Sequence, residues 1–380
     1  MPRYCTPYIL KDFGKKMVFI GGPRQVGKTT LSKEILQNSF PKGQYFNWDV
    51  DEDRYAILHK AWRADSDLVV FDELHKYLRW KQWIKGVYDS RPKKQTYLVT
   101  GSARLDVYRQ GGDSLMGRYH YWRLHPFTID EFPASISQKE AYERLLIFGG
   151  FPEPFLIADE REAKRWRRER FDRILKEDIR DLEQIRHIQL LYVLLDLLRE
   201  RVSGLITIAN LAEDLQVSSK TVKHWIKLIE RMYIGFCVYP YTHKLARAIQ
   251  KPPKFYFYDN ADVVDSTGSR LENLVATTLL KRLNFIEDYF GERCSLHYIR
   301  DKEKREVDFV TVINNKVIDL IEVKNNQKDI SSSLKYYQKL LQPKNTIQIV
   351  GNLHNPYDKD GIRVTNPIDF FVNPPWQGKT

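Results

Sequence analysis

The sequence is poor in cysteine and has no long apolar run. Its 380 residues include three scattered cysteines, Cys5, Cys237 and Cys294, and no Cys-x-x-Cys pair that would indicate a zinc site. Such a set favours reduced thiols, so we expect a cytoplasmic protein. No stretch approaches the ~18 consecutive apolar residues of a membrane span, and the first residues lack the apolar core of a signal peptide. We therefore expect no membrane partner.

Acidic residues are outnumbered by basic ones. The chain carries 61 Lys and Arg against 49 Asp and Glu, a formal net charge of +12. An excess of this size favours polyanionic partners, with DNA as the first candidate and a merely basic surface as the alternative. The length exceeds that of one ordinary hydrophobic core, so we expect two or three domains.

Apolar runs alternate with helical patterns in the first third of the chain. Strands are predicted over 17–21, 43–48, 67–72 and 96–100, and helices over 28–38, 53–63 and 79–90. This alternation predicts a doubly wound α/β domain with a parallel sheet, to which we assign residues 1–135.

A glycine-rich loop follows the first predicted strand and opens a helix. Eight consecutive residues fit the pattern G-x-x-x-x-G-K-[ST] without a mismatch: Gly22, Pro23, Arg24, Gln25, Val26, Gly27, Lys28 and Thr29. Backbone N–H groups of such a loop point at phosphate oxygens, and the helix start adds its positive end. Lys28 is expected to reach the β- and γ-phosphates, Thr29 to be a ligand of Mg²⁺, and Thr30 to extend the set. The sequence therefore predicts a P-loop that binds ATP and Mg²⁺.

Two acids follow the strand predicted over 67–72. The apolar residues bury this strand, so Asp72 emerges at its carboxyl end beside the glycine loop, with Glu73 next. Asp72 is expected to hold Mg²⁺ through water, and Glu73 to polarise the attacking water. Adjacent acids in this position favour hydrolysis over binding alone. An exposed pair of loop acids is the alternative.

Two further positions complete the predicted site. Ser102 is expected to sense the γ-phosphate, with Thr100 as the alternative, although both residues could simply cap a strand end. Arg118 is expected to neutralise transition-state charge in a neighbouring copy, with Arg104 as its competitor. An ordinary surface arginine is the alternative for each. An arginine that acts on a neighbour requires a homo-oligomer, which the sequence leaves open.

The order and spacing of these motifs resemble those of prokaryotic AAA+ ATPases that carry a C-terminal domain of unknown function, DUF4143. The resemblance is carried by segments spread over nearly the whole chain: 22–31, 72–73, 100–102, 117–118, 148–153, 251–259, 305–309 and 321–324. One departure is at 260–262, where the family usually has a glycine and this chain reads Asn-Ala-Asp. The resemblance implies an AAA+-like P-loop domain followed by a DUF4143 domain at 246–365.

Residues 206–233 follow a helix, turn, helix pattern within a helical region that we assign to 136–245. Ser218 or Ser219 is expected to cap the second helix, and the strand at 235–239 suits a wing. The exposed positions of that helix are mostly basic: Lys220, Thr221, Lys223, His224 and Lys227. This composition suits contact with DNA phosphates better than base reading. A structural or protein-docking module is the alternative.

A third constellation lies in the last domain, where a helix at 268–284 precedes strands at 294–300, 306–313 and 317–323. Asp308, Glu322 and Lys324 have the spacing of the core of restriction-type nucleases, and Glu272 is the helix acid that often accompanies it. A three-residue loop at 314–316 would set Asp308 opposite Glu322. The three acids would then hold a divalent metal, while Lys324 activates a water.

These predictions lead to an α/β protein with an AAA+-like domain, a helical winged helix-turn-helix middle, an α+β restriction-endonuclease-like domain and a loose tail at 366–380. We expect an ATPase whose nucleotide cycle controls a DNA-binding module, one that cuts DNA if its metal site is real. The alternative is a regulatory ATPase switch that binds protein partners through an inactive nuclease-like domain.

Overall fold

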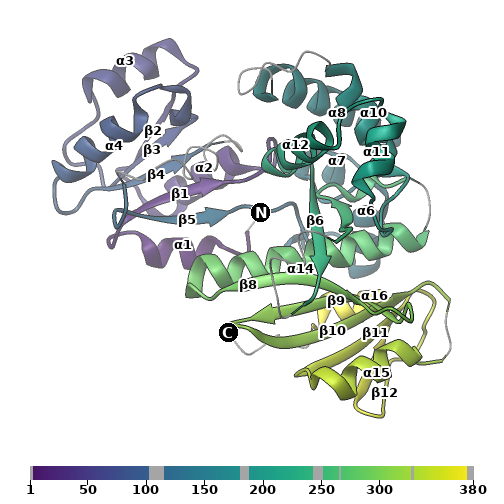
Figure 1. The fold of residues 1–380 in the computed structure, drawn as a ribbon. Helices are drawn as coiled ribbons and strands as arrows, with labels where there is room; N and C mark the ends of the chain where they lie inside the picture. The colour runs from purple at the N-terminus through teal and green to yellow at the C-terminus, as the bar shows by residue number, and fades with distance from the viewer. Residues whose placement is uncertain are drawn as a thin grey trace. The chain divides into compact units, whose positions relative to one another are not determined.

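The computed structural model describes residues 3–101, 115–179, 188–242, 251–264, 267–326 and 329–374. The chain divides into two compact units (Figure 1). One comprises Met1–Pro126 together with Arg231–Tyr233, and the other comprises Phe127–Glu230 together with Ile234–Thr380. The domain boundaries proposed from the sequence remain predictions. None of the helices in the described residues is long and apolar enough to cross a membrane.

The first unit is built on a parallel sheet with the strand order β2-β3-β4-β1-β5. Its strands are β1 (Met17–Gly21), β2 (Gln44–Asn47), β3 (Leu68–Asp72), β4 (Thr96–Thr100) and β5 (Tyr119–Arg123). Its helices are α1 (Thr6–Asp12), α2 (Lys28–Ser39), α3 (Asp51–His59), η1 (Leu74–Lys76) and α4 (Trp80–Asp89). The predicted doubly wound fold is confirmed. Helix α3 ends earlier than predicted, at His59, because Lys60 follows it in a left-handed conformation with a φ of 54°.

Both faces of the central strands are buried, which explains their continuous apolar runs. Phe19, Val69 and Phe71 share a core cluster with Ile84 of α4 and Ile57 of α3. The alternate residues face the opposite side, where α2 packs on β3 and β4. Because all five strands are parallel, their carboxyl ends lie along one edge of the sheet. That edge carries the glycine loop and the two acids.

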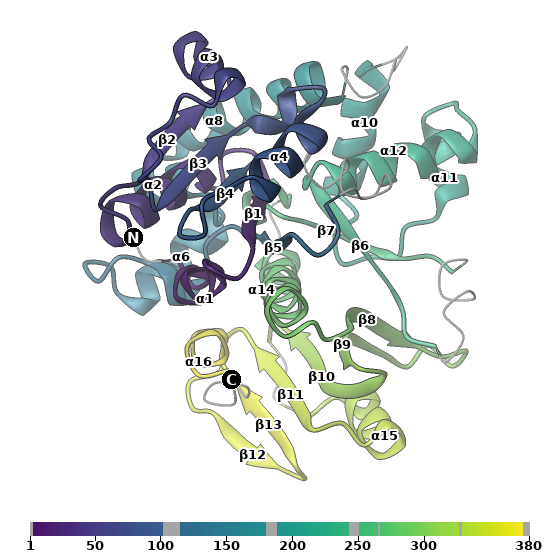
Figure 2. The same cartoon turned by 90° about the vertical axis from the view of Figure 1, so that its left-hand side faces the viewer.

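The second unit begins with helices and continues into a mixed sheet (Figure 2). Its helical part contains η2 (Ile129–Glu131), α6 (Gln138–Ile147), α7 (Pro152–Ile157), α8 (Glu160–Arg173), η3 (Ile174–Ile179), α10 (Ile188–Arg199), α11 (Ile208–Asp214) and α12 (Ser219–Arg231). Helices α11 and α12 form the predicted helix-turn-helix. The Oγ of Ser218 accepts from the N–H of Thr221 at 3.0 Å, which caps α12.

The sheet of the second unit has the order β12-β13-β11-β10-β9-β8-β6-β7. Its strands are β6 (Gly235–Pro240), β7 (Lys254–Phe257), β8 (Cys294–Arg300), β9 (Glu306–Ile313), β10 (Lys316–Lys324), β11 (Asn345–Val350), β12 (Tyr357–Lys359) and β13 (Ile362–Thr365). The strand expected as a wing forms as β6, but it pairs with β7 and β8 of this sheet. Helix α14 (Thr267–Phe290) packs on β7 to β10, and α15 (Ser332–Leu341) packs on β9 and β10.

Part of the tail predicted to be loose is ordered. Helix α16 (Pro367–Val372) is capped by Asn366, whose side chain accepts from the N–H of Asp369 at 2.8 Å. Phe370 and Phe371 are buried. The prediction from Pro, Asn and Gly content was therefore wrong for this segment, because an Asn cap followed by Pro starts a helix as readily as it marks a loop.

The loop of the hairpin between β9 and β10 is shorter than predicted. Its loop has two residues, Asn314 and Asn315, both with positive φ, and not three. A register shift between Val317 and Asp319 then inserts one extra residue into β10. Beyond this bulge Ile321 pairs with Phe309, so the next step of the register sets Glu322 opposite Asp308. The bulge produces the juxtaposition that was expected from a longer loop.

Candidate nucleotide site and acidic centre

The glycine loop curls around the ammonium group of Lys28. Lys28 begins α2 and is buried, and its Nζ donates to the carbonyl oxygens of Gly22 at 3.2 Å and Pro23 at 2.6 Å. Gly22 and Gly27 have φ values of 138° and 96°, which side chains rarely adopt. A Cβ at Gly22 would also lie 2.4 Å from the carbonyl oxygen of Leu124. Both glycines are therefore required by the path of the loop.

The other loop residues differ in their exposure. Between the glycines, Val26 is buried and Gln25 has a positive φ of 60°. Arg24 is partly buried, while Thr29 and Thr30 lie exposed on the first turn of α2. The loop thus leads directly from β1 into a helix N-terminus, which is the arrangement that binds phosphate groups.

Asp72 accepts hydrogen bonds from three hydroxyl groups. Thr29 of the loop and Tyr45 of β2 both donate to its Oδ2, each at 2.6 Å, and Thr100 of β4 donates to its Oδ1. Thr29 and Asp72, the two residues predicted to share Mg²⁺, are therefore in direct contact. Tyr45 did not emerge from the sequence, because its only signal is the parallel register that sets it opposite Val70, two residues before Asp72.

Glu73 follows β3 in a left-handed conformation, with a φ of 57°. Its Oε2 lies 3.7 Å from Nε2 of His75 and 3.5 Å from Nζ of Lys76, which also contacts Asp49. Burial raises the pKa of Glu73, while the charges of Lys28 and Lys76 oppose that rise. A carboxylate with a raised pKa is suited to accepting a proton.

Arg118 lies away from this edge of the sheet. It immediately precedes β5, which runs parallel to β1, so it lies at the opposite end of the strands from the glycine loop. Its guanidinium forms a two-pronged pair with Asp89, at 2.8 Å and 3.1 Å. Arg118 is therefore not brought together with Lys28 in the same chain. Ser102 and Arg104 lie outside the described residues.

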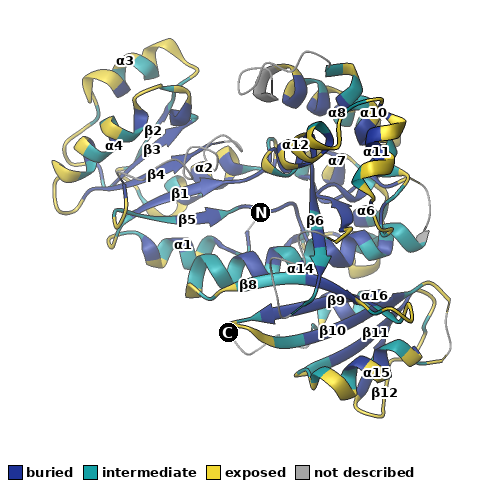
Figure 3. Cartoon of the chain, in the orientation of Figure 1, coloured by how far each residue is buried: buried dark blue, intermediate teal, exposed yellow. Residues whose placement is uncertain are grey.

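The second helix of the helix-turn-helix presents a basic face. Lys220, Lys223 and Lys227 are exposed, whereas Val222 and Trp225 between them are buried, as the burial colouring of α12 illustrates (Figure 3). Within the described part of the chain, none of the three lysines forms an ion pair. The exposed side of this helix is therefore basic.

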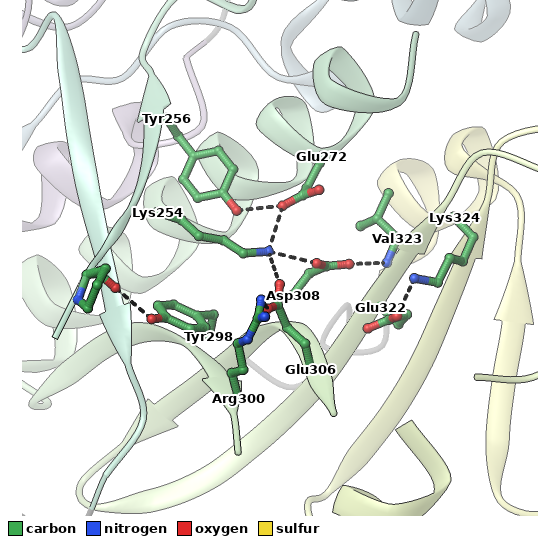
Figure 4. Close-up of polar contacts among 11 residues, drawn as sticks. Lys254, Tyr256, Glu272, Tyr298, Arg300, Glu306, Asp308, Glu322, Val323 and Lys324 are labelled. Atoms are coloured by element: carbon green, nitrogen blue, oxygen red, sulfur yellow. Dashed lines mark hydrogen bonds and ion pairs between the residues drawn. The ribbon is translucent and has the colours of Figure 1, made fainter. Parts of the chain in front are cut away.

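The second unit holds an acidic centre with a lysine inside it (Figure 4). Nζ of Lys254, the first residue of β7, lies 2.8 Å from Glu306, 2.9 Å from Asp308 and 3.3 Å from Glu272. Tyr256 donates its hydroxyl to the same oxygen of Glu272 at 2.7 Å. Burial and the charge of Asp308 raise the pKa of Glu272 to about 7.

Glu322 and Lys324 stand beside this cluster. Nζ of Lys324 lies 2.6 Å from Oε1 of Glu322, while Oε2 is buried and has no hydrogen-bond partner within the described residues. Burial and the charge of Asp308 raise the pKa of Glu322 to about 8. The fold therefore brings the four predicted residues of this centre near one another. Among the described residues, however, no three His, Cys, Asp or Glu side chains are arranged to hold one metal ion.

Two motifs that carry the family resemblance meet in the second unit. Gly149 has a φ of 78°, and a Cβ there would lie 1.8 Å from Oδ1 of Asp259. Arg170 of α8 is buried with its guanidinium 3.8 Å from the centre of the Phe151 ring, and none of its nitrogens has a hydrogen-bond partner within the described residues. Asp259 and Asp262 supply the opposite charge. Sequence reasoning missed this cluster because its members are up to 113 positions apart.

Three family models match successive parts of the chain. Residues 14–133 match an AAA domain, residues 139–264 a domain of unknown function (DUF8612), and residues 267–369 a domain of unknown function (DUF4143). The AAA match contains the glycine loop, both acids and Thr100. The DUF4143 match contains Glu272 and the hairpin, whereas Lys254 falls within the DUF8612 match.

Relatives match the chain at low identity. The uncharacterized protein MJ1544 of Methanocaldococcus jannaschii is 24% identical over 366 residues, which cover 88% of this chain and 80% of the relative. The uncharacterized protein Rv2008c of Mycobacterium tuberculosis is 25% identical over 244 residues, 64% of this chain and 54% of the relative. The signal transduction ATPase PH0952 of Pyrococcus horikoshii, a solved structure, matches at 13% identity over 75% of this chain and 45% of its own, with a TM-score of 0.24, too low to show a shared fold.

The chain thus combines a segment that matches an AAA domain with a C-terminal segment that matches DUF4143, and the AAA match supports nucleotide binding and ATPase activity.

Proposed function

We propose that the chain hydrolyses ATP with Mg²⁺ at the carboxyl edge of the five-stranded sheet. The contact between Thr29 and Asp72 carries this proposal, because it joins the end of the glycine loop to the first of the two acids. Lys28 lies in the same loop, with its ammonium group facing inward. A hydroxyl, a carboxylate and an ammonium group gathered beside a helix N-terminus fit a magnesium-bound triphosphate.

Each residue has a distinct task in this proposal. Loop N–H groups and Lys28 bind the phosphate oxygens, and Thr29 with Asp72 would hold Mg²⁺, which neutralises charge on those oxygens. Glu73 accepts a proton from the attacking water, for which its raised pKa is suited. Ser102 is proposed to contact the γ-phosphate. Arg118 would act on another copy of the chain in a homo-oligomer, because it lies at the far edge of its own sheet.

Two substitutions test the ATPase site. Lys28→Ala should abolish binding of ATP, whereas Glu73→Gln should keep binding and lower the turnover number by about 100-fold or more. Binding is measured with a fluorescent ATP analogue and turnover by phosphate release. Lys94→Ala, at an exposed position in the same unit, is the matched control. Near-normal ATP affinity in the Lys28 variant would overturn the loop assignment, and unchanged hydrolysis in the Glu73 variant would remove Glu73 as the base.

We further propose that the nucleotide cycle controls contact between α12 and DNA. The basic face of Lys220, Lys223 and Lys227 supports this idea, since exposed lysines that form no ion pair with the described residues are suited to phosphate contact. The composition favours binding without strong sequence preference. We expect the protein to act in the cytoplasm, where DNA is accessible to it in a prokaryotic cell.

The mixed sheet supports a restriction-endonuclease-like reading of the last module, since β9, β10 and α14 carry the acids of such a centre. The lysine within that centre favours the second candidate function, a regulatory ATPase whose nuclease-like module binds a partner without cutting DNA. Plasmid DNA incubated with the protein and Mg²⁺ or Mn²⁺, with and without ATP, separates the two. Nicking that is lost in Asp308→Ala would establish cleavage by this centre.

A further inference from the structure

Lys254 is the most deeply buried charge of the acidic centre. Its residue surface is 2% exposed, and its Nζ contacts carboxylate oxygens of Glu306, Asp308 and Glu272. Burial would lower the pKa of Lys254, but the charge of Asp308 and its neighbours outweighs burial and holds the pKa well above its usual value. A buried ammonium group is stable only when it is paired in this way. The contacts with these acids therefore favour the charged form of the lysine.

The geometry around Nζ is that of a cation held by several acids. Figure 4 shows the ammonium group between Glu272 on α14 and the two acids of β9. The three nitrogen–oxygen distances run from 2.8 to 3.3 Å, whereas oxygen ligands lie about 2.0 to 2.6 Å from Mg²⁺ or Ca²⁺. An ammonium group and a divalent ion cannot share this position, because they would repel each other and occupy the same volume.

Two further acids of the centre each contact a basic side chain, but one oxygen of Glu322 has no partner among the described residues. Arg300 lies 2.8 Å from Glu306, and Lys324 lies 2.6 Å from Oε1 of Glu322. Oε2 of Glu322 is buried without a partner, in a residue that is 3% exposed. The register of the hairpin sets Glu322 opposite Asp308. A buried carboxylate oxygen without a donor is costly, so this oxygen indicates a position where a further ligand belongs.

We propose that Lys254 is the resident cation of the acidic centre, and that a divalent cation can bind to Glu272, Asp308 and Glu322 only after Lys254 has left. With Lys254 in place the centre is closed to metal, and the hairpin and α14 are joined by an internal ion pair. Without it, the carboxylates of Glu272, Asp308 and Glu322 would offer only oxygen atoms to an incoming ion, and oxygen ligands are those that hard divalent cations prefer. The inference is independent of the ATPase activity, since it concerns residues of the second unit alone.

The experiment measures binding of Mn²⁺ to the full-length chain at pH 8, by isothermal titration and by the loss of the free-ion signal in electron paramagnetic resonance. Nucleotide is omitted, and every protein carries Asp72→Asn to silence the proposed magnesium position of the first unit. We expect no binding below about 1 mM with Lys254 present. The Lys254→Met protein should bind Mn²⁺ at least about ten-fold more tightly than the protein with Lys254. The Lys254→Arg protein keeps the positive charge, so its acidic centre should still not bind Mn²⁺.

A third variant assigns any binding to this centre. Asp308→Asn, added to Lys254→Met, should remove the Mn²⁺ that the single change admits. The proposal is overturned if the protein with Lys254 intact binds Mn²⁺ and loses it with Asp308→Asn. It is also overturned if a folded Lys254→Met protein gains no binding. Should the Lys254→Met protein fail to fold, Lys254→Gln takes its place. The measurement on the protein that retains Lys254 still decides whether the centre excludes Mn²⁺.

Discussion

The phenol oxygen of Tyr45 lies 2.6 Å from Oδ2 of Asp72, the same oxygen to which Thr29 donates. Burial and this hydrogen bond raise the pKa of Tyr45, so its hydroxyl keeps its proton and remains a donor. Asp72 is thereby fixed from two strands and from the glycine loop at once. A carboxylate held by three hydroxyl donors keeps its orientation, which is what a magnesium-binding residue requires.

Tyr45→Phe is therefore expected to impair ATP hydrolysis modestly. The variant removes one of three hydrogen bonds to Asp72, a loss of about 1 kcal/mol, which corresponds to roughly a five-fold lower kcat/KM. Steady-state hydrolysis at varied Mg²⁺ measures the effect, and Tyr55→Phe on the exposed side of α3 is the control. If kcat/KM falls as far as it does in Asp72→Asn, Tyr45 takes part in the reaction itself. If kcat/KM does not fall, the hydrogen bond from Tyr45 does not contribute to hydrolysis.

Lys76→Ala is expected to shift the pH dependence of hydrolysis. The charge of Lys76 opposes the rise that burial causes in the pKa of Glu73, so its removal raises that pKa further. Glu73 must be ionised to accept a proton, and the acidic limb of the kcat profile should therefore move to higher pH. The plateau at alkaline pH should stay within about two-fold of the wild type. Lys94→Ala should leave the profile in place, and a shift toward lower pH in the Lys76 variant would contradict the role given to Glu73.

Local signals in the sequence are enough to predict where the glycine loop and the two acids lie. The glycine loop, the burial of β3 and the acids after it each depend on a few neighbouring residues, and the parallel sheet brings them to one edge without further information. Tyr45 is different. Its contribution depends on β2 lying beside β3, and nothing within β2 itself distinguishes that position from an ordinary strand tyrosine.

The acidic centre shows where prediction from the sequence stops. The hairpin loop was predicted one residue too long, and the bulge after Val317 compensates for the difference, so Asp308 and Glu322 meet for a reason that spacing alone does not reveal. Lys254 is 54 positions from Asp308 and reaches it from another strand. Residues that combine across such separations depend on tertiary packing, and a single sequence carries no local trace of it.

Neutralising the basic face of α12 is expected to weaken DNA binding and to make the affinity less dependent on salt concentration. Each phosphate contact adds about 0.9 to the slope of log affinity against log salt, so Lys220→Gln, Lys223→Gln and Lys227→Gln together should flatten the slope by up to about 3. Fluorescence anisotropy of a labelled duplex at several salt concentrations measures it. A triple variant at the exposed Lys60, Lys93 and Lys94 is the matched control. Equal slopes in the two triple variants would favour a protein-docking role for this helix.

The buried charges around Arg170 predict a pH-dependent stability of the second unit. Burial, together with the charge of Asp262, raises the pKa of Asp259 to about 7, against the opposing charges of Arg170 and Arg167. The folded state therefore binds a proton at this carboxyl that the unfolded chain has already released above pH 3.8. For such a group, the stabilisation is full below the unfolded pKa and is lost as the pH rises toward 7.

Asp259→Asn should remove that dependence. The unfolding midpoint of the variant, relative to that of the wild type, is expected to rise by several degrees between pH 4 and pH 7 and to level off above pH 7. The prediction concerns how the midpoint difference between variant and wild type changes with pH. The difference at any one pH is not predicted, because the amide also removes a negative charge from the surroundings of Arg170. Thermal unfolding followed by circular dichroism across this range measures it, with Asp358→Asn on the exposed strand β12 as the control. A difference that is flat from pH 4 to pH 7 would show that the Asp259 carboxyl titrates as it does in the unfolded chain, and that Arg170 compensates its burial in full.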